Sequence, residues 1–89
     1  MKTSVDEALV HQIKDGDEDA FELMVIKYRP RILASLLRYT SSRELSEDLT
    51  QQTFLRVWEK IDTFKGNSTL FTWIYSISIN LARNYYVSS

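Results

Sequence analysis

The chain has 89 residues, enough for one small domain with a thin hydrophobic core. Its hydrophobic content of 44% and formal net charge of −1 indicate a globular protein, and they argue against a protein that coats duplex DNA through many phosphate contacts. The sequence has no cysteine, which excludes disulfides and thiolate metal sites, and no apolar run approaches the roughly 20 residues of a membrane span. We therefore expect a cytoplasmic protein without membrane insertion.

Acidic residues are distributed unevenly. All 12 Asp and Glu lie at or before Asp62, and from residue 63 onward only Lys65 and Arg83 carry a formal side-chain charge. The same segment is rich in aromatic and short polar side chains. A surface without carboxylates, but with aromatic rings and amides, suits single-stranded nucleic acid, whose bases can be stacked and hydrogen-bonded.

Glycine and proline are scarce, and the apolar spacing is helical along the whole chain. The sequence therefore predicts an all-α fold, a compact bundle of four helices without a sheet. We expect one domain over residues 1–89. Its helices are expected at about 5–15, 18–39, 44–61 and 69–86, with a loop at 62–68.

The first two helices have recognisable ends. Ser4 is expected to begin the first helix, with Glu7 in a capping box, and Gly16 to end it. Asp17 is expected to cap the second helix, in which Pro30 falls on the solvent side and bends rather than breaks it. The expected buried residues are Val5, Leu9 and Ile13 in the first helix, and Phe21, Val25, Tyr28, Ile32, Leu36 and Tyr39 in the second.

The last two helices follow the same logic. Ser41 with Glu44 predicts a second capping box at the start of the third helix, and Asn67 or Ser68 is expected to cap the fourth. The expected buried residues are Leu45, Leu49, Phe54, Val57, Trp58 and Ile61 in the third helix, and Leu70, Ile74, Ile77, Leu81 and Tyr85 in the fourth.

The third helix has a second face, with Asp48, Gln51, Gln52 and Leu55 at spacing i, i+3, i+4 and i+7. An exposed leucine beside two glutamines and an aspartate is typical of a protein-docking strip. A plain solvent-facing surface has the same pattern, so both interpretations stay open.

The fourth helix presents Trp73, Ser76, Asn80 and Asn84 along one face, with Arg83 adjacent. Trp73 fits the core equally well. Asn80 stands out because asparagine is a poor helix former that has no capping role in mid-helix. Its amide offers the donor and the acceptor that a base edge requires.

The loop before this helix has features of a pocket for one extruded base. Gly66 allows close backbone approach, Ser68 and Thr69 supply hydroxyls, and Phe64 lies beside them.

These motifs together resemble a known family. Residues 48–58 (DLTQQTFLRVW) are similar to the D-L-x-Q-[EQ]-x-F-L-x-x-W signature of extracytoplasmic-function sigma factors, the group IV sigma factors of bacterial RNA polymerase. Further matches, to F-[RK]-G-x-S, T-W-[IL]-Y, N-x-x-[KR]-[ND]-Y and the family's first conserved segment, lie at 64–68, 72–75, 80–85, and 16–21 with Tyr28 and Arg29. The match covers essentially the whole chain and corresponds to the second sigma domain.

The resemblance implies three roles. The loop at 64–69 corresponds to the specificity loop that captures a base flipped from the non-template strand of the promoter −10 element. The fourth helix corresponds to the segment that contacts neighbouring −10 bases and phosphates. The residues that would dock on the clamp helices of the polymerase β′ subunit are Asp48, Gln51, Gln52, Leu55 and Trp58. The residues that would bind DNA are Phe64, Lys65, Gly66, Asn67, Ser68, Thr69, Phe71, Trp73, Ser76, Ile77, Asn80, Arg83 and Asn84.

Two positions depart from the family pattern. Ser76 stands where members often carry a basic residue, which should weaken phosphate contact. Asn67 stands where they often carry an acidic one, which should change the base that the loop prefers. The resemblance also implies an anti-sigma factor as a partner, and an isolated domain without the −35-binding domain of such factors.

We therefore expect a domain that recognises and melts the −10 element in transcription initiation, without a cofactor. A single histidine, no cysteine and no paired-carboxylate cleft predict no catalysis and no metal site. The alternative is a helical protein-interaction module in which the docking strip is the whole function and the aromatic residues are core. A helix-turn-helix reader of duplex DNA fits poorly, because the last helix lacks cations for phosphates.

Overall fold

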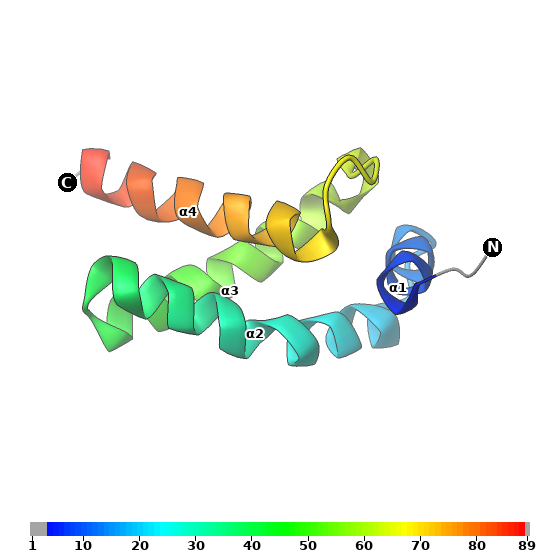
Figure 1. Cartoon of the computed structure of the whole chain (residues 1–89), viewed down its shortest axis with the longest axis horizontal. Helices are drawn as coiled ribbons and strands as arrows, with labels where there is room; N and C mark the ends of the chain where they lie inside the picture. The colour runs from blue at the N-terminus through cyan, green and yellow to red at the C-terminus, as the bar shows by residue number, and fades with distance from the viewer. Residues whose placement is uncertain (1–3, 89) are drawn as a thin grey trace.

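A computed structural model describes residues 4–88, which contain four α-helices and no strand, as the sequence predicts. Figure 1 shows α3 crossing behind α2 and α4, with α1 at one end of the molecule. The elements in chain order are α1 (Val5–Lys14), α2 (Glu18–Thr40), α3 (Arg43–Lys60), the short 3-10 helix η1 (Ile61–Thr63) and α4 (Leu70–Ser88).

The ends of α1 and the start of α2 follow the predicted capping chemistry. Ser4 Oγ accepts a hydrogen bond from the Glu7 N–H at 3.0 Å, and the Asp17 carboxylate accepts one from the Ala20 N–H at 3.1 Å. Gly16 follows α1 with a φ of +90°, which glycine adopts without steric cost. These three predictions are confirmed.

The predicted cap of α3 is wrong by one residue. Ser42 caps the helix, because its Oγ accepts a hydrogen bond from the Leu45 N–H at 3.2 Å. Ser41 instead ends α2 in the left-handed region, with φ at 60°, and its N–H donates to the Leu37 carbonyl. The chain needs this residue to reverse direction, so the predicted box with Glu44 does not form.

The predicted cap of α4 is also wrong. Thr69 Oγ1 accepts the hydrogen bond from the Thr72 N–H at 3.1 Å, so neither Asn67 nor Ser68 caps the helix. The Ser68 hydroxyl donates to the Thr69 carbonyl at 3.1 Å and is therefore engaged elsewhere.

One core joins all four helices around α3. Most predicted core positions are buried or half-buried, but Val5, Tyr39, Trp58 and Tyr85 are exposed at 69%, 45%, 39% and 47%, so they were wrongly assigned to it. All four lie within the first or last turn of their helices, where packing between neighbouring helices is less complete. The buried apolar residues are Leu9, Val10, Ile13, Ala20, Met24, Tyr28, Ile32, Leu36, Leu49, Phe54, Val57, Ile61, Phe64, Leu70, Ile74 and Ala82.

Four small hydroxyl residues, Ser46, Thr50, Thr53 and Ser78, are completely buried. Thr50 and Thr53 donate to carbonyls one turn earlier in α3, both at 2.7 Å, and Ser78 donates to the Tyr75 carbonyl at 2.7 Å. Ser46 shares a hydrogen bond with the Thr40 hydroxyl at 2.7 Å. Each hydroxyl has a hydrogen-bond partner, which offsets the cost of removing it from water.

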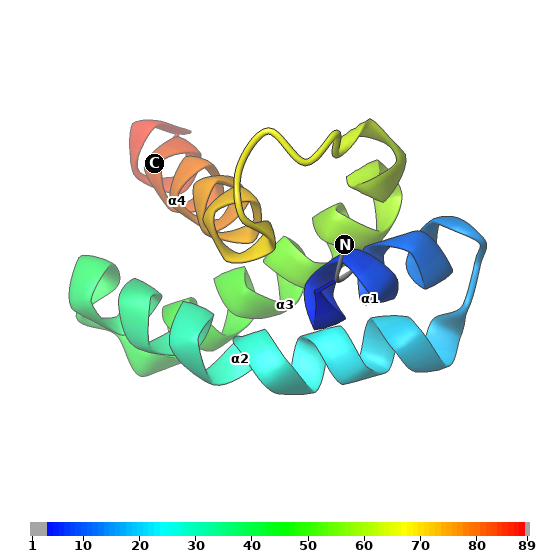
Figure 2. The same cartoon turned by 45° about the vertical axis from the view of Figure 1, so that its right-hand side comes forward.

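An ion pair holds α1 on α2. The Asp6 carboxylate accepts hydrogen bonds from Lys27 Nζ at 2.7 Å and from the Tyr28 hydroxyl. Partial burial opposes ionisation of Asp6, but the hydrogen bonds from both partners outweigh it and lower the Asp6 pKa. Figure 2 shows that α1 and the loop before α4 lie at the same end of the molecule.

Candidate nucleic-acid interface

The loop between η1 and α4, residues 64–69, starts from a fixed point. The Phe64 ring is buried, at 8% exposure, and lies 5.0 Å from the Trp73 ring at 39° between planes. The Phe64 N–H donates to the Ile61 carbonyl at 3.0 Å, while its own carbonyl accepts a hydrogen bond from Lys14 Nζ at 2.6 Å. Residues 65–69 are all exposed. The loop thus projects from a residue held on several sides.

Gly66 gives this loop its shape. Its φ is +78°, and a Cβ placed there would meet no protein atom within 4 Å. The requirement for glycine is therefore conformational, because L-residues with a side chain adopt this region only with strain.

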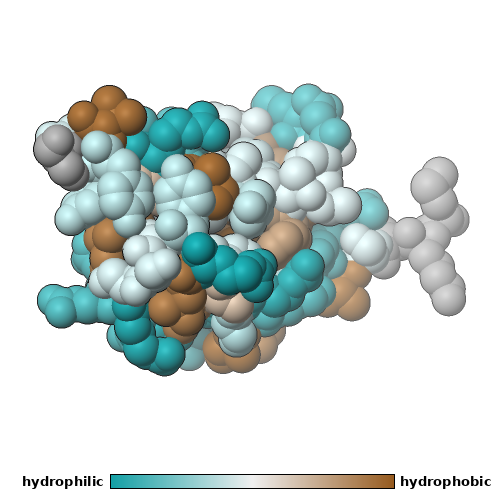
Figure 3. Space-filling model, turned by 60° about the vertical axis from the view of Figure 1, so that its left-hand side comes forward, coloured by the Kyte–Doolittle hydropathy of each residue, from teal (hydrophilic) through white to brown (hydrophobic). Residues whose placement is uncertain are grey.

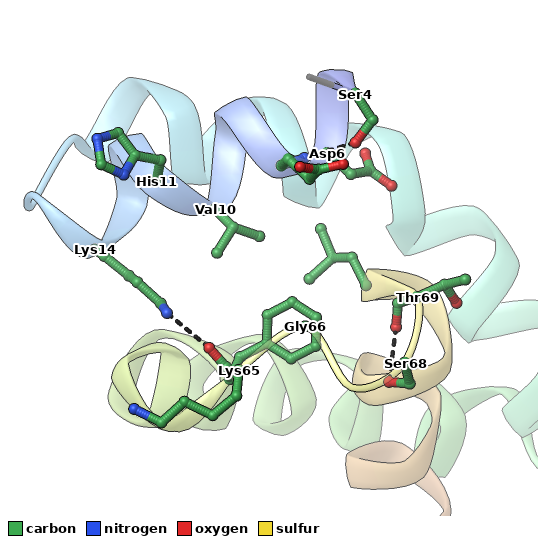
Figure 4. Close-up of a pocket in the computed structure, with 12 residues that line it drawn as sticks. Ser4, Asp6, Val10, His11, Lys14, Lys65, Gly66, Ser68 and Thr69 are labelled. Atoms are coloured by element: carbon green, nitrogen blue, oxygen red, sulfur yellow. Dashed lines mark hydrogen bonds between the residues drawn. The ribbon is translucent and has the colours of Figure 1, made fainter. Parts of the chain in front are cut away.

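A hollow of about 780 Å³ lies between this loop and α1. Figure 4 shows Lys14 reaching across it from α1 to the loop, while Val10 points into it. Its apolar lining comes from Val10, Phe64 and Leu70, and hydroxyls of Ser68 and Thr69 lie at the loop side. The hollow is large enough to admit a nucleobase, and apolar surface beside hydroxyl groups suits such a planar ligand. On the α1 side it is also lined by Asp6 and Glu7.

The predicted face of α4 is largely accessible. Ser76, Asn80, Arg83 and Asn84 are exposed, and Trp73 is half-buried against Phe64. The Ser76 hydroxyl donates to the carbonyl of Trp73 at 2.7 Å, so its proton is already used within the helix.

Asn80 and Asn84 both offer available amides on this face. No hydrogen bond within residues 4–88 engages either of the two amides. An exposed amide with both functions free can hydrogen-bond a base edge without first breaking an internal contact.

Like the buried Phe64, Phe71 and Ile77 are less accessible than the other predicted DNA-binding residues. Phe71 packs towards α2, where the Arg31 guanidinium lies 3.7 Å from its ring centroid and the Tyr28 ring 5.8 Å from it. Because Phe71 and Trp73 are separated by roughly 200° around the helix, the two rings face different neighbours. Ile77 is half-buried against the core. The contact with Arg31 was missed from the sequence, where nothing links two residues so far apart.

The predicted docking strip on α3 is exposed along its length. Leu55 is 60% exposed, and the Gln52 amide donates to the Asp48 carboxylate at 2.8 Å. Gln51 and Leu55 also line a groove of about 360 Å³ between α2 and α3. Trp58 borders the strip, with its ring edge-on to the Phe21 ring at 5.0 Å.

The end of α4 lies against the end of α2. The Tyr86 ring lies 6.0 Å from the Tyr39 ring, and its hydroxyl donates to the Thr40 carbonyl at 3.4 Å. Figure 3 brings this end of the molecule forward and shows hydrophobic residues as separate patches among hydrophilic and neutral ones. Between residues 4 and 88, no helix is long and apolar enough to cross a membrane. No cluster of three or more metal-ligating side chains occurs in that range.

Comparison with known proteins decides the family. The family model described as Sigma-70 region 2 matches residues 24–89. The chain belongs to this family. The resemblance drawn from the motifs of α3, the 64–69 loop and α4 is thereby confirmed. The matched segment begins inside α2, so α1 lies outside it.

Relatives of the chain carry matching names. The chain is 38% identical over 80 residues to the ECF RNA polymerase sigma-E factor of Haemophilus influenzae, covering 90% of this chain and 42% of the relative. It is 35% identical over 83 residues both to the sigma-E factor of Escherichia coli K12 and to the RNA polymerase sigma-H factor of Pseudomonas aeruginosa, in each case 93% of this chain and 43% of the relative. The chain therefore spans less than half the length of these curated relatives.

A solved structure supports the same fold. The NMR structure of an engineered region 2 of sigmaE in complex with GTAAAA matches with a TM-score of 0.84 at 31% identity. The match covers 99% of this chain and 93% of the other. The all-α, four-helix region 2 fold is thus confirmed.

Proposed function

We propose that this region 2 domain recognises the promoter −10 element during transcription initiation and helps to melt it by capturing a flipped base of the non-template strand. The observation that carries the proposal is the pairing of the 64–69 loop with an accessible Asn80 on the adjoining helix, in a fold shared with a relative solved in complex with GTAAAA. Flipping costs a few kcal/mol per base, which stacking and amide hydrogen bonds in the pocket must return.

Different residues of the proposed interface contact phosphates and bases. Lys65 and Arg83 are the formal charges of the 63–89 segment and contact phosphates. Trp73 offers a partly exposed ring for stacking, and Asn80 contacts a base edge. Phe64 is buried, so it contributes indirectly, by packing on Trp73 and fixing the start of the loop.

Polymerase docking is assigned to the α3 strip. We propose that Asp48, Gln51, Gln52, Leu55 and Trp58 bind the clamp helices of the polymerase β′ subunit. The exposed Leu55 and the neighbouring α2–α3 groove supply an apolar centre, and the amides and carboxylate supply a polar rim. This docking would bring the domain to promoter DNA and supply most of the binding free energy.

Substituting Asn80 tests the proposal. Asn80→Ala should weaken binding of single-stranded −10 oligonucleotides by about 1–3 kcal/mol at one base position, the usual value of a base contact. Gln51→Ala is the matched control, since it removes an exposed helical amide from the docking strip. Equal affinity of the wild type across a panel of −10 sequences would favour the alternative, a protein-interaction module without base preference.

Salt dependence separates the proposal from a duplex reader. Because single strands give a log–log slope of about −0.7 for each neutralised phosphate, two cations predict a shallow slope of about −1 to −3. A steep slope with duplex DNA, typical of a protein that makes many phosphate contacts, would place the DNA surface elsewhere.

The remaining expectations concern the surroundings of the domain. We propose that it acts in the cytoplasm, with the polymerase, and that an anti-sigma factor controls access to it. We also propose that it catalyses no reaction. Binding to purified core polymerase, with and without added oligonucleotide, is the direct assay of the association with polymerase.

A further inference from the structure

One hydrogen bond joins α1 to the 64–69 loop across 50 positions of the sequence. Lys14 Nζ donates to the Phe64 carbonyl at 2.6 Å. No carboxylate lies in ion-pair distance of Lys14 within residues 4–88, so its ammonium group is committed to the loop. A hydrogen bond from a charged donor is stronger than one between neutral groups, and partial burial limits competition from water.

The position of this bond matters for the loop. The Phe64 carbonyl is the last backbone acceptor before the exposed residues 65–69. Packing on Trp73 fixes the Phe64 ring, and the bond to Lys14 fixes the orientation of the following peptide plane. Together they set the direction in which the loop leaves the core, and thus the placement of Gly66 and Ser68 around the hollow.

The end of α1 is built to hold Lys14 in place. Ile13 is buried at 2% exposure, and Gly16 turns the chain directly afterwards with φ at +90°. The lysine therefore extends from a fixed backbone, and Figure 4 shows its side chain spanning the gap to the loop.

We propose that Lys14 is a positioning residue for base selection, which holds the 64–69 loop in the shape that accepts the captured base. This inference rests on the proposed function and adds α1 to it as the second wall of the site. The residue itself contacts no DNA. Its loss should therefore reduce discrimination between bases more than overall affinity for the strand.

The test compares Lys14→Met with Lys14→Arg, which retains a charged donor, and with Lys60→Met, which removes an exposed cation near η1. Each protein is titrated with single-stranded DNA containing GTAAAA and with versions that carry one abasic site at successive positions. In the wild type, the abasic site at the captured position should weaken binding about tenfold or more. In Lys14→Met this penalty should fall to about threefold or less, with the affinity for the abasic strand unchanged, as expected for loss of one hydrogen bond.

A second readout uses the free protein. Lys14→Met should shift the amide NMR signals of Lys65 and Gly66, whereas Lys60→Met should not, and Lys14→Arg should restore both the signals and the penalty. Lys14→Gln, whose shorter side chain cannot reach the carbonyl, gives an independent variant if the methionine protein does not fold.

The outcomes are separable. A wild-type penalty that persists in Lys14→Met would overturn the inference and leave the proposed function intact. An equal loss of affinity for intact and abasic strands, shared by Lys60→Met, would show that Lys14 acts through charge alone. No penalty at any position in the wild type would overturn base capture and this inference with it.

Discussion

The ring of Trp73 packs on the ring of Phe64, with 5.0 Å between centroids and 39° between planes. The pair joins the first turns of α4 to the start of the 64–69 loop. The loop and α4, both proposed to contact the −10 strand, are therefore packed together, and the position of the loop depends on Trp73 of the helix.

This ring pair should have a measurable coupling energy. A double-mutant cycle with Phe64→Leu and Trp73→Leu, followed by urea unfolding, should give about 0.5–1.5 kcal/mol beyond the loss of buried area. The pair of Phe21 and Trp58, also at 5.0 Å, is the control because it lies on the α2–α3 side. Loss of oligonucleotide affinity should accompany the first pair only; equal losses from both would contradict a role of the first pair in binding.

Gly66 should be sensitive to conformation rather than to volume. Since no protein atom lies within 4 Å of a Cβ at this position, Gly66→Ala should cost about 1–2 kcal/mol through its φ of +78°. Gly66→Asn adds a larger side chain but tolerates this region better, so it should retain more of the stability and more of the oligonucleotide affinity. The reverse order would mean that DNA approaches the backbone too closely for any side chain.

Leu55 should affect polymerase binding without affecting stability. Because it is 60% exposed, Leu55→Glu should change the free energy of unfolding by no more than about 0.5 kcal/mol. Its affinity for core polymerase should fall by about tenfold or more if the strip is the docking surface, while single-stranded DNA binds as before. Arg56→Ala, an adjacent exposed position, is the control, and a parallel loss there would argue for a nonspecific electrostatic contact.

Asp6 should make stability depend on pH in the acid range. Its pKa in the folded state is lowered from 3.8, since the hydrogen bonds from Lys27 and Tyr28 outweigh the opposing effect of burial. The stabilisation is therefore present above the unfolded pKa and is lost as the pH falls through the folded pKa. Asp6→Asn should cost about 1 kcal/mol at pH 7 after allowance for solvent screening, and the difference should shrink below about pH 4.

Urea unfolding at several pH values measures this difference. Asp15→Asn is the control, because that carboxylate is 73% exposed and lies 3.9 Å from His11. A difference between Asp6→Asn and the wild type that stays constant from pH 7 to acid would assign the effect to shape instead of charge.

Local signals were sufficient for the number of helices and for most of their ends. Ser4, Gly16 and Asp17 act within a few residues of their own positions, so the sequence alone reveals them. The errors arose where one residue had two plausible roles. Ser41 and Ser42 are both good caps, and only the reversal of the chain decides that Ser41 takes the left-handed conformation.

Contacts between distant segments were beyond the sequence. Helical spacing put Ile77 and Leu81 at the centre of the buried face of α4, but the structure centres it on Ile74, Ser78 and Ala82. The small residues Ser78 and Ala82 were overlooked because the prediction followed the large apolar side chains, although small residues permit close helix packing. The α3 strip and the polar residues of the α4 face are exposed as predicted, because helical periodicity places them away from the core.

The hydrogen bond from Lys14 has a practical consequence for choosing the N-terminal boundary of an expressed fragment. The segment that defines the family begins at residue 24, so a fragment cloned to that boundary would keep every sigma-factor motif of α3 and α4. It would lose the buried Leu9, Val10 and Ile13, together with the tether on Phe64. Such a fragment would retain all the proposed DNA-binding residues, but its 64–69 loop would lack the hydrogen bond from Lys14. If it failed to distinguish promoters, the failure would be attributed wrongly to the motifs.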